Sequence, residues 1–367
     1  MVREQDLRSW LQLLVVVALA VASQGQDSVI GKPMFAVRSA EPIVAEAALS
    51  ASTRTVNHWT SSFPSKGTPS SYSYAMVGAS PFTNPASSTT INTEIQPITL
   101  KFANGNTISG TAAAVALANS PIFLKTNFQA GSGQYADIFQ RANFAKPIAG
   151  KPYHVLLGLP SVRSALVVNV PKSSGTTKRT PSGVLYGLVN FDFITKTIAS
   201  LARTGGYNPT SLPIFVTGNV FEYEQMISIC CVLGYHDALT PASGQLLTFI
   251  YASYPSAGLL SGGFADTAVV SHEVAEWMDD PFGTNSVAPW GQPQNPKICF
   301  SNLLEVGDAI EAFSNPTFTA SLNGKTYHLQ DEAFFSWFAR QSPSIGAGGR
   351  YSYIQPAKLT KPAPACN

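Results

Sequence analysis

The chain of 367 residues carries few charges for its size: 12% of its residues are Asp, Glu, Lys or Arg, about half of the roughly 25% typical of soluble domains. An apolar content of 45% suffices for one large core or two smaller ones, which excludes a disordered chain. The net charge is +2, and no run of Lys or Arg offers a surface for phosphate backbones or anionic lipid. We therefore expect no nucleic-acid partner.

The first 22 residues have the pattern of an export signal. Arg3 and Arg8 precede the apolar run of residues 11–22, which ends in the small-x-small sequence Ala-Val-Ala. As a helix this run spans only about 18 Å, too short for a hydrocarbon core of roughly 30 Å. We expect a secreted protein, or a periplasmic one if the source is bacterial, without membrane association once the signal is removed.

Three regions are expected after the signal. Residues 23–69 are rich in Ala, Ser and Thr and form a leader, a pro-segment or a strand that wraps the domain. Residues 70–179 are predicted to be rich in β-structure because short apolar runs alternate with Pro, Gly and Asn. Residues 180–360 mix strands with helices, and they complete a predicted α+β fold. The oligomeric state stays open.

Individual elements follow from the apolar periodicity. In the β-rich region we predict a hairpin of residues 95–102 and 107–115, and one helix over residues 133–144. The later elements are a strand and helix over 184–201, a buried strand over 245–254, a helix over 266–279, a hairpin of 317–322 and 325–329, and a closing helix over 331–340.

The four cysteines allow two disulfides in an oxidising compartment. Cys230 and Cys231 are adjacent, and a bond between neighbours is strained. We therefore expect at least one of them to reach Cys299 or Cys366.

The segment of residues 271–280, Ser-His-Glu-Val-Ala-Glu-Trp-Met-Asp-Asp, concentrates acids and one histidine on an otherwise apolar predicted helix. His272 and Glu276 are four residues apart, so a helix places them on one face about 6 Å apart, where both can bind one metal ion. Glu273 stands where the H-E-x-x-H helices of zinc enzymes carry the general base that deprotonates water. The pattern predicts a metal site, with zinc as the expected ion. Asp279 and Asp280 either end the helix or accompany a nearby cation.

A third ligand has to come from another segment. Glu305 and Asp308 are nearly the only acids in the stretch that follows the helix. We favour Glu305 as the ligand and Asp308 as the residue that orients His272 through its other ring nitrogen. The reversed assignment and a solvated turn with ordinary acids remain as alternatives.

His236 is a further candidate, in a Gly-Tyr-His-Asp sequence predicted to turn just before the buried strand over 245–254. It can lie at the rim of the same site as a metal ligand or as a proton donor to an oxyanion, and a purely structural histidine is the alternative. The other three histidines, His58, His154 and His328, are interpreted as structural.

Together, the Gly-aromatic-His sequence at 234–236, the His-Glu-Val-Ala-Glu helix and the Glu-Val-Gly-Asp segment at 305–308 resemble the exordium or phosphate-induced family of plant extracellular proteins. Similar secreted bacterial proteins of unknown function share this pattern. The helix also resembles the active-site helix of zincin metallopeptidases, so the region after residue 180 is expected to be zincin-like.

Two functions are consistent with these features. The first is a secreted metal-dependent hydrolase, most simply a zinc peptidase acting on a peptide or cell-wall substrate, with His272, Glu276 and Glu305 as ligands and Glu273 as general base. The alternative is a non-catalytic extracellular or cell-wall-associated exordium-like protein with a structural ion or none.

Overall fold

The computed structural model describes residues 30, 33, 54–64, 71–240, 245–311, 313–353 and 359–366. The predicted export signal and most of the predicted leader lie outside these residues. Within them, no helix is long and apolar enough to cross a lipid bilayer.

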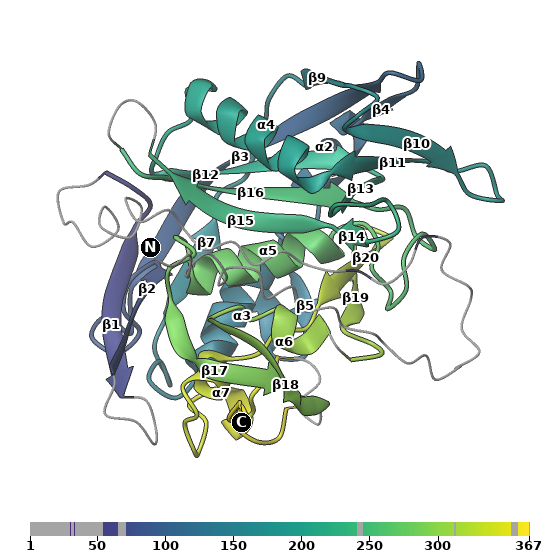
Figure 1. Cartoon of the computed structure of the whole chain (residues 1–367). Coiled ribbons are helices and arrows are strands. Elements are labelled where there is room, and N and C mark those ends of the chain that lie inside the picture. Colours follow the sequence, from purple (N-terminus) through teal and green to yellow (C-terminus); the bar gives the residue numbers. More distant parts are fainter. Residues whose placement is uncertain are drawn as a thin grey trace, which may run out of the picture.

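The fold is α+β and dominated by strands (Figure 1). The strands of the first half are β1 (His58–Pro64), β2 (Ser71–Val77), β3 (Ser88–Phe102), β4 (Thr107–Ser109), β5 (Thr126–Phe128), β6 (Gly131–Gly133), β7 (His154–Leu157), β8 (Ser161–Val162), β9 (Leu166–Val170) and β10 (Gly175–Arg179). Those of the second half are β11 (Leu185–Asn190), β12 (Ser211–Gly218), β13 (Val220–Tyr223), β14 (Cys230–Val232), β15 (Gly234–Leu239), β16 (Leu247–Tyr254), β17 (Ser286–Gln292), β18 (Asn295–Leu303), β19 (Thr317–Leu322) and β20 (Lys325–Gln330). The helices are α2 (Thr111–Ala118), α3 (Tyr135–Asn143), α4 (Phe191–Thr204), α5 (Ala268–Asp279), α6 (Asp308–Glu311) and α7 (Phe335–Phe338), with a short 3-10 turn at Ala347–Gly349.

The largest sheet has the strand order β15-β16-β12-β3-β4, and β7, β8 and β9 also pair with the long strand β3. Strand β12 runs parallel to both β16 and β3, whereas β15 runs antiparallel to β16. Strands from both the predicted β-rich region and the predicted zincin-like region therefore belong to one sheet. A second sheet has the order β10-β11-β13-β14.

Helices cover the two faces of this sheet at β16, with α4 on one face and α5 on the other (Figure 1). Successive side chains of a strand point to opposite faces. Accordingly Ile250 and Ala252 belong to the apolar cluster that contains α5, while Phe249 and Tyr251 belong to the cluster that contains α4. Because both faces are covered, β16 is buried along nearly its whole length, as the sequence predicts.

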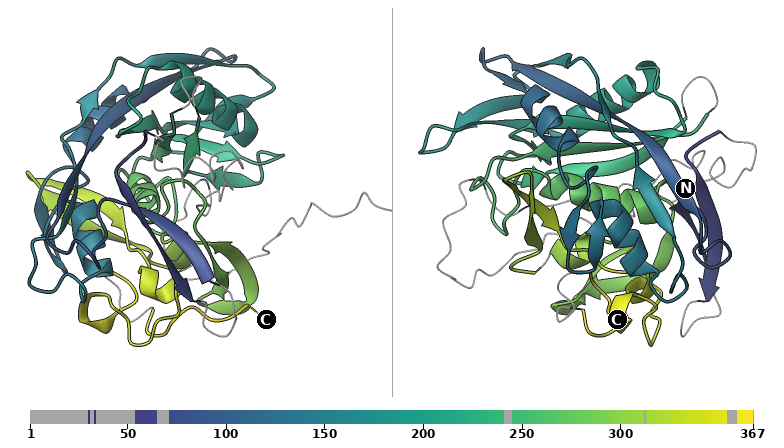
Figure 2. Two further views of the ribbon diagram at one scale, coloured as in Figure 1. Left: turned by 90° about the vertical axis from the view of Figure 1, so that its left-hand side faces the viewer. Right: turned by 180° about the vertical axis from the view of Figure 1, so that it is seen from behind.

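The β1–β2 hairpin runs along one side of the molecule toward the C-terminal elements in both views of Figure 2. Val56, Trp59 and Phe63 of this segment are buried in the main core. Of the three interpretations of residues 23–69, the described part, residues 54–64, matches the strand that packs on the domain.

Most predicted elements are confirmed, with small shifts at their ends, but two are wrong. The predicted second hairpin strand over 107–115 ends at Ser109, and helix α2 begins at Thr111. Gly110 lies against the backbone oxygens of Val216 and Ile98, where a Cβ has no room, and the Ala-rich sequence that follows favours a helix. The predicted closing helix over 331–340 contains only α7. The residues before it are extended and donate backbone hydrogen bonds to other segments, as from Ala333 N to Val306 O at 2.9 Å.

The cysteine prediction is also wrong. Cys230 bonds to its neighbour Cys231, and Cys299 bonds to Cys366. The second bond closes a 67-residue separation and ties β18 to the C-terminal segment. The prediction rested on the strain of a bond between neighbouring cysteines, and the sequence carries no information on which distant segment the tertiary fold brings next to Cys366.

Candidate metal centre

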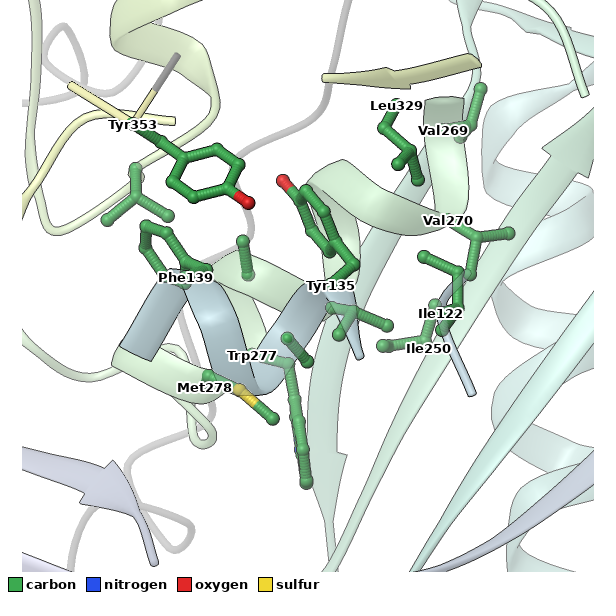
Figure 3. Packing of buried hydrophobic residues seen from close by; sticks show 14 of the residues in the cluster. Ile122, Tyr135, Phe139, Ile250, Val269, Val270, Trp277, Met278, Leu329 and Tyr353 are labelled. Atoms are coloured by element: carbon green, nitrogen blue, oxygen red, sulfur yellow. The ribbon is translucent and has the colours of Figure 1, made fainter. Parts of the chain in front are cut away.

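Helix α5 carries the predicted site and is buried along its whole length. Its apolar side chains Val269, Val270, Trp277 and Met278 pack among residues of other elements, with Tyr135 of α3 close by (Figure 3). The indole Nε1 of Trp277 donates a hydrogen bond of 2.9 Å to Thr248 Oγ1 in β16. These contacts fix the rotation of the helix, and with it the direction of the polar side chains on its remaining face.

One group of possible ligands contains His272, Glu276 and Asp308. His272 Nε2 lies 3.1 Å from Glu276 Oε2 and 3.7 Å from Asp308 Oδ1. Two atoms bound to the same tetrahedral zinc at 2.0 to 2.1 Å are about 3.4 Å apart. The group therefore has the spacing of metal ligands, and the three residues can hold a metal ion.

A second group contains His236, Glu276 and Glu305. His236 Nδ1 lies 3.7 Å from Glu276 Oε2. The sequence suggested a turn at His236, but His236 lies within strand β15, which pairs with β16. This strand packs beside α5, and that brings His236 to the same polar face of the helix.

The segment that precedes α6 orients Glu276. Glu276 Oε1 accepts hydrogen bonds from the backbone N–H groups of Gly307 at 3.1 Å and Asp308 at 3.3 Å. Gly307 lies directly against the imidazole of His272, where a Cβ would clash with the ring. A glycine is therefore required for this close approach, and it leaves Glu276 Oε2 directed toward the two histidines.

Gln330, at the end of β20, orients His272. Its Nε2 donates to Gly307 O at 2.8 Å, which directs its Oε1 to His272 Nδ1 at 3.1 Å. In the neutral ring Nδ1 is then the donor, and the Nε2 lone pair faces the acids. From the sequence, Asp308 was expected in this orienting position. The structure instead places Gln330 there and Asp308 on the Nε2 side.

Glu273 belongs to neither group. It is 1% exposed, and neither of its carboxylate oxygens accepts a hydrogen bond. Its nearest charged partner is His236, whose Nδ1 lies 3.6 Å from Glu273 Oε2. Burial raises the pKa of Glu273, and the nearby His236 and His272 only partly offset this effect.

The buried acids of both groups repel one another. Burial, followed by the charge of Glu276, raises the pKa values of Glu305 and Asp308 well above their usual range. Burial is the largest influence on the pKa of Glu276 and acts to raise it, but the interactions with His272, His236 and the Gly307 N–H together outweigh it, and the pKa of Glu276 is lowered. Burial acts to lower the pKa of His272, and Glu276 reverses that effect, so the pKa of His272 is raised well above its usual value.

Asp279 and Asp280, at the end of the same helix, have a different environment. Asp279 accepts hydrogen bonds from Gln140 Nε2 at 2.5 Å and Asn143 Nδ2 at 2.8 Å. Asp280 accepts from the backbone N–H groups of Thr284 and Asn285, both at 2.9 Å. Amide donors therefore stabilise these two acids, which favours their interpretation as the end of the helix.

All six predicted site residues, from three separate segments, converge on one face of α5: His236, His272, Glu273, Glu276, Glu305 and Asp308. Gln330 and Gly307 were missed. A lone glutamine at the end of a strand has no local pattern that would have revealed its role. Gly307, between the two candidate acids, could have been recognised as a place where backbone approaches a side chain.

Comparison with protein-family models, with curated proteins and with solved structures finds no match to this chain.

Proposed function

We propose that this protein is a secreted metal-dependent hydrolase of the zinc-peptidase type. His272, Glu276 and Asp308 hold the catalytic ion in this proposal, and Glu273 is the general base. The observation that carries it is Glu273, a buried carboxylate without a hydrogen-bond donor, beside two sets of residues with the spacing of metal ligands.

The chain's own residues have distinct tasks in this reaction. Zinc supplies Lewis-acid activation of water and of the substrate carbonyl when it is bound. Glu273 takes a proton from the attacking water as the oxygen of that water bonds to the carbonyl carbon. It then passes the proton to the leaving nitrogen as the carbon–nitrogen bond breaks. Its raised pKa suits this exchange, because a base works best when its pKa approaches the working pH.

Asp308 replaces Glu305 as the third ligand in this proposal because Asp308 groups with His272 and Glu276. Asp308 Oδ1 lies 3.7 Å from His272 Nε2 and has no hydrogen-bond donor of its own. Glu305 groups with His236 instead. This is the reversed assignment that the sequence analysis left open.

The two disulfides are consistent with an oxidising compartment and support the proposal of secretion. A peptide or a cell-wall amide is the proposed substrate class.

The test is Glu273→Gln, which removes the base and retains every proposed ligand. Hydrolysis of a peptide library should fall by about 10²- to 10⁴-fold, while zinc content, measured by mass spectrometry of the purified protein, stays as in the wild type. Glu222→Gln is a matched control, since Glu222 is a buried acid that accepts a hydrogen bond of 2.6 Å from Tyr251. Full activity in Glu273→Gln would remove Glu273 from the mechanism.

A second candidate is the non-catalytic extracellular protein that resembles the exordium family, with a structural ion. The observation that favours it is burial, because the six site side chains are at most 7% exposed. In that case zinc binds and stabilises the fold, but neither the wild type nor Glu273→Gln hydrolyses peptides above background.

A further inference from the structure

We propose that this centre holds two divalent cations and that Glu276 bridges them. The proposal rests on the proposed function for the first ion and adds a second site made of His236, Glu276 and Glu305. Glu276 is the one residue common to the two ligand groups found in the described part of the chain.

The orientation of Glu276 supports a bridge. Its Oε1 is engaged by two backbone N–H groups, and its Oε2 is the atom near both histidines, 3.1 Å from His272 Nε2 and 3.7 Å from His236 Nδ1. One oxygen therefore faces two nitrogens that belong to different groups. Pairs of ions in two-metal hydrolases lie about 3.5 to 4 Å apart and share such a ligand.

Charge balance supports the second ion independently. Four carboxylates lie in this cluster, Glu273, Glu276, Glu305 and Asp308, and all of them are at most 4% exposed. Metal ligands bind in their deprotonated form, with neutral histidines. Two divalent cations balance the four negative charges, whereas with one ion the two remaining buried acids would have to take up protons or carry charge at a high cost in free energy.

Unpartnered atoms mark both halves of the cluster. Asp308 Oδ1 in the first group and both oxygens of Glu273 beside His236 are buried and accept no hydrogen bond. Buried polar atoms are nearly always satisfied in proteins, so such atoms indicate a missing partner. A cation in the first group supplies it for Asp308, and a cation in the second group places a positive charge near Glu273.

The second ion has a clear consequence for Glu273. Its carboxylate lies 3.6 Å from His236 Nδ1, so it stands directly beside a residue of the second group as well as next to His272 in the helix. Water placed between the two ions would lie within reach of this base. His236 is then a metal ligand, and the role of proton donor to an oxyanion is not needed.

The test is a zinc count on the full chain, incubated with zinc, freed of excess by dialysis and measured by mass spectrometry. We expect two zinc ions per chain in the wild type and in the control Glu222→Gln, one in His236→Ala and in Glu305→Gln, and none in Glu276→Gln. One ion in the wild type would overturn the bridge and leave the proposed function intact, whereas no ion would overturn both. Two ions that persist in both His236→Ala and Glu305→Gln would place the second ion elsewhere and overturn the proposal.

Cobalt provides a measurement that needs no variant. The wild type is titrated with Co²⁺ and followed by electron paramagnetic resonance. Two ions joined by one carboxylate oxygen are magnetically coupled, so the second equivalent should reduce the signal of the first. A signal that doubles with the second equivalent would show two separate sites and contradict the bridge.

Discussion

The middle and the C-terminal end of helix α5 carry acids of the same kind in different environments. Near its middle, Glu273 and Glu276 face histidines and further acids, and Glu273 has no hydrogen-bond donor. At its C-terminal end, Asp279 and Asp280 are equally buried, but side-chain and backbone amides surround them. A buried acid needs either donors or a cation. The fold provides amide donors for both acids at the C-terminal end. In the middle of the helix, backbone N–H groups engage only Glu276 Oε1 and Glu273 has no donor, so this part is suited to cations.

The amides around Asp279 are themselves oriented by the fold. Asn143 Oδ1 accepts a hydrogen bond of 2.8 Å from the backbone N–H of Phe335, which turns its Nδ2 toward Asp279. Asn285 Nδ2 donates to the backbone oxygens of Ala75 and Asp279. This end of the helix therefore ties α3, α7 and β2 to α5, a role in the architecture rather than in chemistry.

The largest expected difference between these two parts of the helix is in the stabilisation of the fold by zinc. Zinc at 1,000 times its Kd should stabilise the wild type by about 4 kcal/mol relative to protein in EDTA. Glu276→Gln should abolish this gain because Glu276 belongs to both ligand groups. The matched control Asp279→Asn should retain it. Thermal unfolding with zinc and with EDTA measures the gain in each variant. An equal gain in Glu276→Gln and Asp279→Asn would show that the two parts of the helix do not differ in metal binding.

Removing a donor from the C-terminal end should destabilise the fold and leave metal binding unchanged. Asn143→Ala deprives Asp279 of a hydrogen bond and leaves the Phe335 N–H without its acceptor, at an expected cost of about 2 to 4 kcal/mol. Urea unfolding in EDTA measures this cost. Asn84→Ala, at an exposed site, is the control. A change below about 0.5 kcal/mol in Asn143→Ala would mean that Asp279 does not depend on this amide.

Gln330→Ala tests whether Gln330 orients the imidazole of His272 for metal binding. The substitution removes the acceptor at His272 Nδ1, and losses of this kind weaken metal affinity by roughly 10- to 100-fold. Zinc titration against a competing chelator measures the change, and saturating zinc should restore full occupancy. Unchanged affinity would show that His272 needs no orienting partner.

The last prediction concerns pH. Burial raises the pKa of Asp279 to about 7 from an ordinary value of 3.8. The folded state then holds a proton that the unfolded state releases. The contribution of Asp279 to stability is therefore complete below about pH 4 and is lost as the pH rises through 7, with a slope of at most about 1.4 kcal/mol per pH unit. Asp279→Asn cannot release a proton, so in EDTA its stability relative to the wild type should rise between pH 4 and 7. Parallel pH profiles of urea midpoints would contradict this assignment.

The amino-acid pattern was sufficient to predict the helix and the face on which its candidate ligands lie. His272 and Glu276 are four residues apart, and that spacing alone places them together once a helix forms, because helical periodicity is a local property of the backbone. The buried strand β16 could likewise be predicted, since its apolar residues are contiguous. The sequence also identified Glu305, Asp308 and His236 as candidates, because acids and histidines are rare in this chain.

The distribution of those candidates between the two groups depends on the packing of the whole chain and could not be predicted. Asp308 joins His272 while Glu305 joins His236, and Gln330 takes the position that orients His272. The pairing of Cys299 with Cys366 likewise could not be predicted from the sequence. Each of these partnerships joins residues tens of positions apart, and their distances depend on how β15, β20 and the segment before α6 pack against α5. Local periodicity places side chains on a face, but only packing of the whole chain determines which atoms from other segments meet them there.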